Sequence, residues 1–160
     1  MGNPFQDAYD AVASTLANSA GVTALVSVNV IRLDDDLEPL IDDYNAGDLP
    51  LLRLTLADSG ERNLHASSQS ADMPMALQLE YVTDREELAA TAGLFALDWV
   101  VLRCLAAALP NFGCRYITKF ELGGFTPQEP REVAEPQETG WRATMPIILY
   151  LSINHNEIKE

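Results

Sequence analysis

The sequence has few basic residues and only two cysteines. Of its 160 residues, 10 are lysine or arginine and 24 are aspartate or glutamate, which gives a formal net charge of −14. So little basic surface disfavours binding to nucleic-acid phosphates or docking on anionic lipid. The cysteines, Cys104 and Cys114, indicate buried free thiols of a reducing compartment, because two residues do not form a disulfide framework.

Recognisable catalytic, metal and phosphate motifs are also absent from the sequence. His65 and His155 have no partner at metal-ligand spacing, so both are interpreted as surface residues. The glycine doublet Gly123-Gly124 lacks the fingerprint of a phosphate-binding loop. The first residues hold neither a basic segment nor a long apolar run, which predicts a cytoplasmic protein without a secretory signal. We therefore expect no enzyme, no cofactor and no metal site.

The composition that is present predicts one globular domain over residues 1–160. Hydrophobic residues make up 48% of the chain, enough to bury a core without disulfides. Apolar residues at helical spacing predict a first helix from Pro4 to about Ala20, with Gly21 as its stop. Residues 22–33 fit a strand or a helical turn, and the extended conformation is the preferred prediction.

Alternation of apolar and polar residues predicts four strands, at residues 50–57, 75–82, 114–122 and 141–153. In the first, Leu52, Leu54 and Leu56 are expected to face the core. The predicted core face of the last strand is formed by Met145, Ile147, Leu149, Leu151 and Ile153. Pro146 cannot donate a ladder hydrogen bond, which indicates a sheet edge or a bulge at that position.

A long helix is predicted between the second and third strands. Thr83-Asp84-Arg85-Glu86 matches a capping box, and Pro110 to Gly113 closes the pattern. The predicted inward stripe is Leu88, Ala92, Phe95, Trp99, Leu102, Ala106 and Leu109. The opposite flank is apolar too, so the helix is expected to be buried on two sides or covered by another subunit. Asp98 and Arg103 argue against a membrane span.

Two connecting segments have unusual composition. Residues 34–48 contain seven acidic residues and no basic one. A calcium loop is disfavoured there, because Pro39 stands at the glycine position and Asn45 at that of the bidentate glutamate. Residues 123–140 contain three prolines and four glutamates and predict an extended arm. The arm is either a mobile hairpin tip or a subunit bridge with Phe125, Pro127, Pro130 and Val133 as contact residues.

The predicted fold is therefore α+β: a mainly antiparallel sheet of four or more strands, packed by an N-terminal helix and one long central helix, with an extended arm between the last two strands. This order, with Leu49-Pro50-Leu51 at the first strand, Glu80-Tyr81-Val82 at the second and Ile147-Ile148-Leu149-Tyr150-Leu151 in the last, resembles the tail terminator (tail-completion) proteins of long-tailed bacteriophages. The similarity spans most of the chain.

The resemblance implies a structural virion protein of the tail and neck region, assembled in the host cytoplasm. Six copies would form a ring that caps the tail tube and offers a surface to the neck or head-closure protein, and to a sheath if the tail is contractile. DNA would pass through the ring without specific binding. The resemblance places an acidic lumen or rim at Asp34, Asp35, Asp36, Glu38, Asp42 and Asp43.

Two alternatives remain open at the level of sequence. The first is another head–tail connector or neck protein, which would share the ring and the acidity. The second is a small soluble enzyme or ligand-binding domain with a pocket between sheet and long helix, lined by Tyr81, Trp99, Tyr116 and Trp141.

Overall fold

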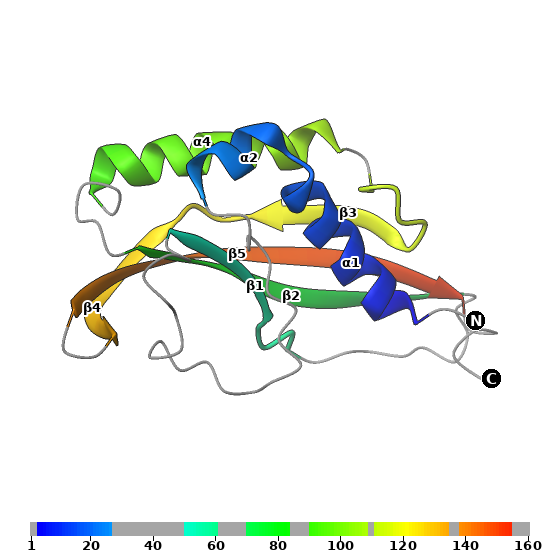
Figure 1. The fold of residues 1–160 in the computed structure, drawn as a ribbon. Coiled ribbons are helices and arrows are strands. Elements are labelled where there is room, and N and C mark those ends of the chain that lie inside the picture. The colour runs from blue at the N-terminus through cyan, green and yellow to red at the C-terminus, as the bar shows by residue number, and fades with distance from the viewer. Residues whose placement is uncertain are drawn as a thin grey trace.

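The protein is a two-layer α+β structure, as the sequence predicts. The computed structural model of the 160-residue chain describes residues 3–26, 50–60, 70–83, 90–108, 111–134 and 138–154. Figure 1 shows the described helices on one face of a twisted sheet. They are α1 (Pro4–Ala17), α2 (Ala20–Leu25) and α4 (Thr91–Ala107), and both shorter helices contact α4.

The described sheet has five antiparallel strands. They are β1 (Leu51–Leu56), β2 (Ser70–Thr83), β3 (Ile117–Leu122), β4 (Thr126–Ala134) and β5 (Glu138–Asn154). The order is β1-β2-β5-β3, and β4 also pairs with β5, on the side opposite to β2. The two longest strands pair from Ser70 with Asn154 to Thr83 with Trp141, so they form the centre of the fold.

The core lies between the helices and the sheet. The five predicted core residues of β5, from Met145 to Ile153, are all buried. In β2 the same alternation buries Met75, Leu77, Leu79 and Tyr81, which confirms the predicted period of two. The sheet face that the helices cover is therefore almost entirely apolar.

The N-terminal helix ends earlier than predicted. Asn3 caps α1 by accepting hydrogen bonds from two backbone amides, and the helix stops at Ala17. Gly21 is not the stop, because it lies inside the short helix α2, whose N-cap is Ser19. The extended conformation predicted from Val22 is therefore wrong for residues 22–25. The remainder of that stretch, from residue 27, lies outside the described residues.

The long helix α4 begins at Thr91 and faces the core with the opposite side from the one predicted. Thr83 belongs to β2, and the other capping-box residues lie outside the described part. The side chains that α4 buries are Leu94, Leu97, Val101 and Leu105. Phe95, Trp99 and Leu102 of the predicted inward stripe are exposed instead. Both sides are apolar, so hydrophobicity alone could not assign the inner one.

Pro146 lies in a central strand and not at a sheet edge. Its carbonyl accepts a hydrogen bond from the Gly123 amide at 3.0 Å, so its missing N–H would also point to that side. There β3 ends, with Leu122 opposite Ile147, and β4 begins, with Thr126 opposite Thr144. The proline therefore sits at the break between two strands, where no ladder donor is required.

Candidate interaction surfaces

The exposed side of α4 carries three of the five exposed large hydrophobic residues among the described part of the chain. Phe95 is 68% exposed, Trp99 59% and Leu102 44%, and these three residues are called the outer stripe below. They follow one another at spacings of four and three, so they lie on one side of the helix. The Arg103 guanidinium lies 5.9 Å from the centroid of the Trp99 ring. The stripe presents roughly 300 Å² of apolar surface, a size often associated with binding.

A shallow groove of about 380 Å³ lies beside the outer stripe. Its other walls come from Leu122, Gly123, Gly124 and Met145, at the break between β3 and β4. The two glycines leave little room for a side chain at this point of the chain. A Cβ on Gly123 would lie only 2.6 Å from the Pro146 ring, and one on Gly124 would lie 3.1 Å from the Asp98 carboxylate.

Asp98 gives this apolar groove one charge. Its carboxylate lines the groove and makes no hydrogen bond or ion pair within the part of the chain that the structure describes. A carboxylate among apolar walls favours a cationic side chain flanked by apolar ones. No group of three metal-ligating side chains occurs among the described residues. The groove is therefore apolar apart from the Asp98 carboxylate.

The face of the sheet opposite the helices, called the open face here, contains a buried ion-pair network at one end. Glu80 forms ion pairs with Arg53, at 3.3 Å between Oε1 and Nη2, and with Arg142, at 3.5 Å between Oε2 and Nε, and the side chain of Glu80 is 7% exposed. Arg53 stands directly opposite Glu80 in the register of β1 and β2. Alternation with the leucines of β1 predicts that Arg53 faces solvent. Arg53 is buried instead, because its charge is paired with that of Glu80.

The other end of the open face is partly exposed and apolar. Tyr150 stands opposite Pro74 on one side and Lys119 on the other. Ile148, two residues before Tyr150, is also half-buried. The Lys119 ammonium lies 4.5 Å from the centroid of the Tyr150 ring, and its side chain is 63% exposed. Pro74, Lys119, Ile148 and Tyr150 are called the open-face patch below.

The predicted arm is a β-hairpin in the structure. Residues 126–134 form β4 and pair with the first part of β5, where the sequence predicts no strand. The last residue of β2, Thr83, pairs with Trp141, so residues 138–140 extend beyond β2 as a two-stranded ribbon (Figure 1).

The four predicted contact residues of the arm have different positions. Phe125 precedes β4 and packs edge-on against Tyr81, with ring centroids 6.4 Å apart, at the base of the hairpin. Pro127 is exposed near the start of β4, and Pro130 and Val133 lie further along the strand. The described aromatic contact between Phe125 and Tyr81 therefore packs the base of the arm on its own subunit.

The other predicted sites are not gathered into one place. Asp34, Asp35, Asp36, Glu38, Asp42 and Asp43 lie outside the described residues, as do His65 and His155. Of the four aromatic residues proposed to line a pocket, Trp99 lines the groove, whereas Tyr81 and Tyr116 are buried. Trp141 is half-buried opposite Thr83. The structure therefore does not bring the four rings together.

Both cysteine thiols are free. Cys114 is buried, and the Cys104 sulfur lies 3.4 Å from the Thr15 carbonyl oxygen of α1. Burial raises the pKa of the Cys104 thiol, and a hydrogen bond with Ser19 lowers it by less. Among the described helices, none is long and apolar enough to be a candidate for crossing a membrane.

Sequence reasoning missed the groove, although two signals pointed to it. The doublet Gly123-Gly124 is the first signal, because both glycines line the groove. Asp98 interrupts an otherwise apolar helix, which is the second signal. Neither signal shows that the two segments meet, because they lie on different elements.

The comparisons with known proteins give likenesses to solved structures alone. No family model and no curated protein matches the sequence. Among solved structures, the fold is similar to a chain described as the virion of a native gene transfer agent particle, with 14% sequence identity and a TM-score of 0.38. The match covers 90% of this chain and 93% of the other. The comparisons therefore place the chain in no family.

Proposed function

We propose that this protein is a structural, non-enzymatic subunit of a phage-like virion, and that it forms a six-membered ring as a tail terminator. The ring caps the tail tube and joins it to the neck. The order of elements that resembles tail terminators supports this role, since the structure contains the predicted α+β fold. The exposed outer stripe of α4 carries the assembly part of the proposal.

The outer stripe requires a partner for a physical reason. Two aromatic rings and a leucine on one side of a helix, each exposed by 44% or more, are costly to leave in water. Roughly 300 Å² of apolar area is less than half of the ~800 Å² that each partner buries in a standard interface. The stripe is therefore proposed as the apolar centre of a larger subunit contact.

The projecting hairpin is proposed as the second part of the contact. The backbone of β4 and β5 continues past the last paired residue of β2, and isolated two-stranded hairpins are marginally stable in water. Pro127, Pro130 and Val133 lie on β4, so they are the residues proposed to reach the neighbouring subunit.

The net charge of −14 fits a ring through which DNA moves without being held. We assign Asp34, Asp35, Asp36, Glu38, Asp42 and Asp43 to its lumen or rim. The partners in this proposal are the tail tube protein on one face and the neck or head-closure protein on the other, with a sheath if the tail is contractile. Another neck component is the alternative, since the same surfaces serve any ring of the neck.

The test is the absolute mass of the purified protein in dilute and concentrated solution, with negative-stain images of any large species. The expected result is a mass of six subunits and annular particles with a central hole. Added tail tubes of a long-tailed phage would distinguish the roles, because a terminator binds tube ends. Rings that bind only the neck would support the alternative, and a protein that stays monomeric in solution and on tubes would overturn the ring.

A hairpin variant tests the second part of the contact. Replacing residues 131–140 by an Asn-Gly turn removes the projecting ribbon but keeps Phe125 against Tyr81. We expect folded monomers with the circular dichroism of the wild type and no rings. Rings of unchanged stability would show that the hairpin is no subunit bridge.

A further inference from the structure

We infer that the outer edge of β3 and the groove beside α4 bind an extended segment of a different protein, which adds to the sheet as a further strand. The side chains of this segment on the helix side of the sheet are apolar, apart from one lysine or arginine that meets Asp98. The inference goes beyond the proposed ring, because this edge takes its partner whether or not the subunits assemble.

The backbone of β3 has donors and acceptors that no described strand uses. The Gly123 amide donates to the Pro146 carbonyl of β5, and residues that bond to the neighbouring strand alternate along an antiparallel pair. In the register of β3 and β5, the N–H and C=O groups of Phe120 and Leu122 therefore point away from β5. These four groups make no hydrogen bond within the described part of the chain. Free backbone groups at a sheet edge are a template for an added strand.

The opposite edge of the sheet differs from the β3 edge, because it is covered. On β1, the Tyr9 hydroxyl donates a hydrogen bond to the Leu54 carbonyl. Leu52 and Leu54 are at most 1% exposed. On β3, Phe120 and Leu122 are only half-buried. Of the two outermost strands, β3 is therefore the one that is open to a partner.

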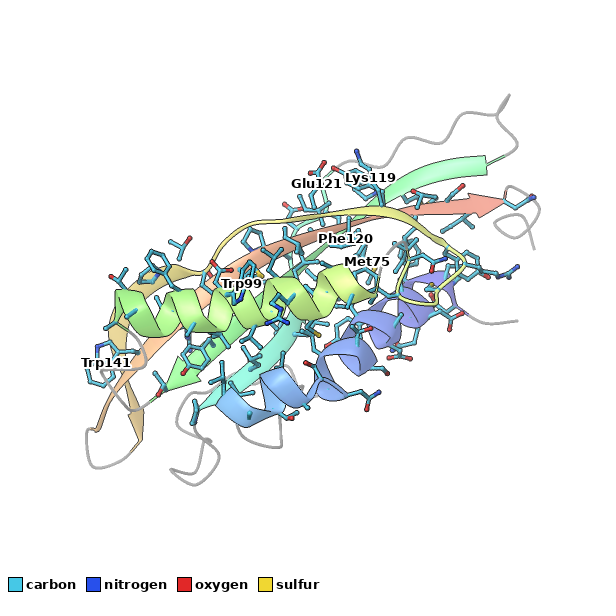
Figure 2. All side chains as sticks on the ribbon, turned by 90° about the horizontal axis from the view of Figure 1, so that it is seen from above. Met75, Trp99, Lys119, Phe120, Glu121 and Trp141 are labelled. Atoms are coloured by element: carbon cyan, nitrogen blue, oxygen red, sulfur yellow. The ribbon has the colours of Figure 1, made fainter. Side chains whose placement is uncertain are left out.

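Proline protects the neighbouring part of the same edge but not β3. β4 pairs with β5 on the side that β3 also uses, and it carries Pro127 and Pro130. A proline offers no N–H and is a common protection of sheet edges, whereas β3 contains none. In Figure 2, Lys119 and Glu121 lie on the side of β3 away from α4, toward the open-face patch, and Phe120 packs against the core. The helix side of this edge is therefore free of charged residues of β3.

The groove beside α4 lies next to this edge and receives side chains of the added strand. Leu122 lines the groove together with the three residues of the outer stripe. Neighbouring strands lie about 4.8 Å apart, and residues opposite each other share one face of the sheet. An apolar residue opposite Leu122 therefore contacts the outer stripe and removes part of it from water. In the proposed ring, the added strand and the neighbouring subunit share the stripe.

Charge selects a different protein as the source of the segment. Asp98 lines the groove and has no hydrogen bond or ion pair among the described residues, so it favours a cation. Two copies of this chain that each carry −14 repel each other. Each basic side chain that the structure describes already contacts an acidic or aromatic residue of its own subunit, and these residues are Arg53, Arg103, Arg115, Lys119 and Arg142. A segment of a less acidic protein supplies the cation instead.

Labelled peptides test the added strand by fluorescence anisotropy with the full chain. The probe is a short peptide in which valine and threonine alternate and one central valine is replaced by lysine. Two further copies carry N-methyl groups, one on the valine and lysine amides and one on the threonine amides. A strand turns alternate N–H groups toward its neighbour, so we expect one methylated copy to lose binding and the other to keep it. Amide hydrogen exchange is expected to slow at Phe120 and Leu122 when the probe binds.

Charge variants test the role of Asp98. Asp98→Asn is expected to weaken binding of the lysine peptide by roughly tenfold, because a charge-assisted hydrogen bond is lost. A peptide with glutamate in place of the lysine is expected to bind the wild type more weakly than the lysine peptide does. Asp10→Asn, at an exposed position on α1, changes the net charge equally and is the matched control. Circular dichroism checks the fold of both variants.

The outcomes separate this inference from the proposed ring. No binding of the lysine peptide at about 1 mM, or equal binding of the two methylated copies, would overturn the added strand. Equal binding of the lysine and glutamate peptides would overturn the pairing with Asp98. Sedimentation of the same samples without peptide reports ring formation, so a failure of the ring is seen independently of peptide binding.

Discussion

The two sides of α4 have similar composition and opposite environments. Leu94, Leu97, Val101 and Leu105 are at most 5% exposed, whereas Phe95, Trp99 and Leu102 are between 44% and 68% exposed. The larger aromatic side chains are on the outside. The comparison shows that α4 has more apolar side chains than the core of the subunit buries. The exposed ones are the strongest structural reason to expect a partner.

The largest expected effect on the free energy of unfolding comes from a matched pair of leucines, one on each side of α4. Leu105 is fully buried and Leu102 is 44% exposed on the same helix. Leu105→Ala leaves a cavity and is expected to lower the free energy of unfolding by about 3 kcal/mol. Leu102→Ala is expected to cost less than about 1 kcal/mol, because part of its surface is already in water. Urea unfolding at a concentration that keeps the protein monomeric measures both. Equal losses would refute the assigned orientation of α4.

A smaller loss is expected at the groove wall. Gly123→Ala brings a Cβ to 2.6 Å from Cγ and 2.8 Å from Cδ of the Pro146 ring, which cannot rotate away. The expected loss in the free energy of unfolding is about 1–3 kcal/mol. Gly124→Ala is the control, since its Cβ meets only the Asp98 carboxylate, the end of a rotatable side chain. A loss at Gly124 as large as that at Gly123 would contradict the steric explanation.

Trp99 is expected to matter little to the folded monomer and much to assembly. Trp99→Ala removes a ring that is 59% exposed and that has the Arg103 guanidinium beside it. The expected loss in the free energy of unfolding is therefore less than about 1 kcal/mol. Ring formation is expected to be lost, because an aromatic residue at an interface centre carries much of the binding energy. Thr91→Ala, an exposed position of α4 outside the stripe, is the control. Rings of the Trp99 variant with normal stability would remove the stripe from the interface.

The core faces of β2 and β5 were predictable because their signal is local, whereas the expectation that Leu56 of β1 faces the core is wrong, because this side chain at the end of its strand is 71% exposed. Alternation identified the core face of β5 and of β2, since every second residue of a strand shares one environment. The orientation of α4 was not predictable, because both of its sides are apolar and the choice depends on which side meets the sheet. The burial of Arg53 depends on Glu80, which lies on another strand, so no local pattern contains it.

The hairpin and the groove were missed for a related reason. β4 carries prolines and glutamates that disfavour a strand, and it pairs with β5 along the edge that β3 leaves when it ends at Leu122. The groove requires α4 to meet the segment after β3, a contact between elements that are separated in the sequence. Properties that arise from one element could be predicted, and properties that arise where two elements meet could not.

The smallest expected effect concerns Cys104, on the flank of α4 that faces α1. Burial holds the pKa of this thiol above its ordinary value in the folded chain. As the pH rises, the thiol of the unfolded chain therefore loses its proton before the thiol of the folded chain does. The contribution of the protonated Cys104 thiol to stability is complete below the ordinary thiol pKa and is lost as the pH rises through the pKa of the folded chain. Urea unfolding of the wild type and of Cys104→Ser between about pH 7 and pH 10 measures the difference. We expect the stability of the wild type to fall more steeply with pH above the ordinary thiol pKa. Parallel curves would show that the flank of α4 is as open to water as its outer side.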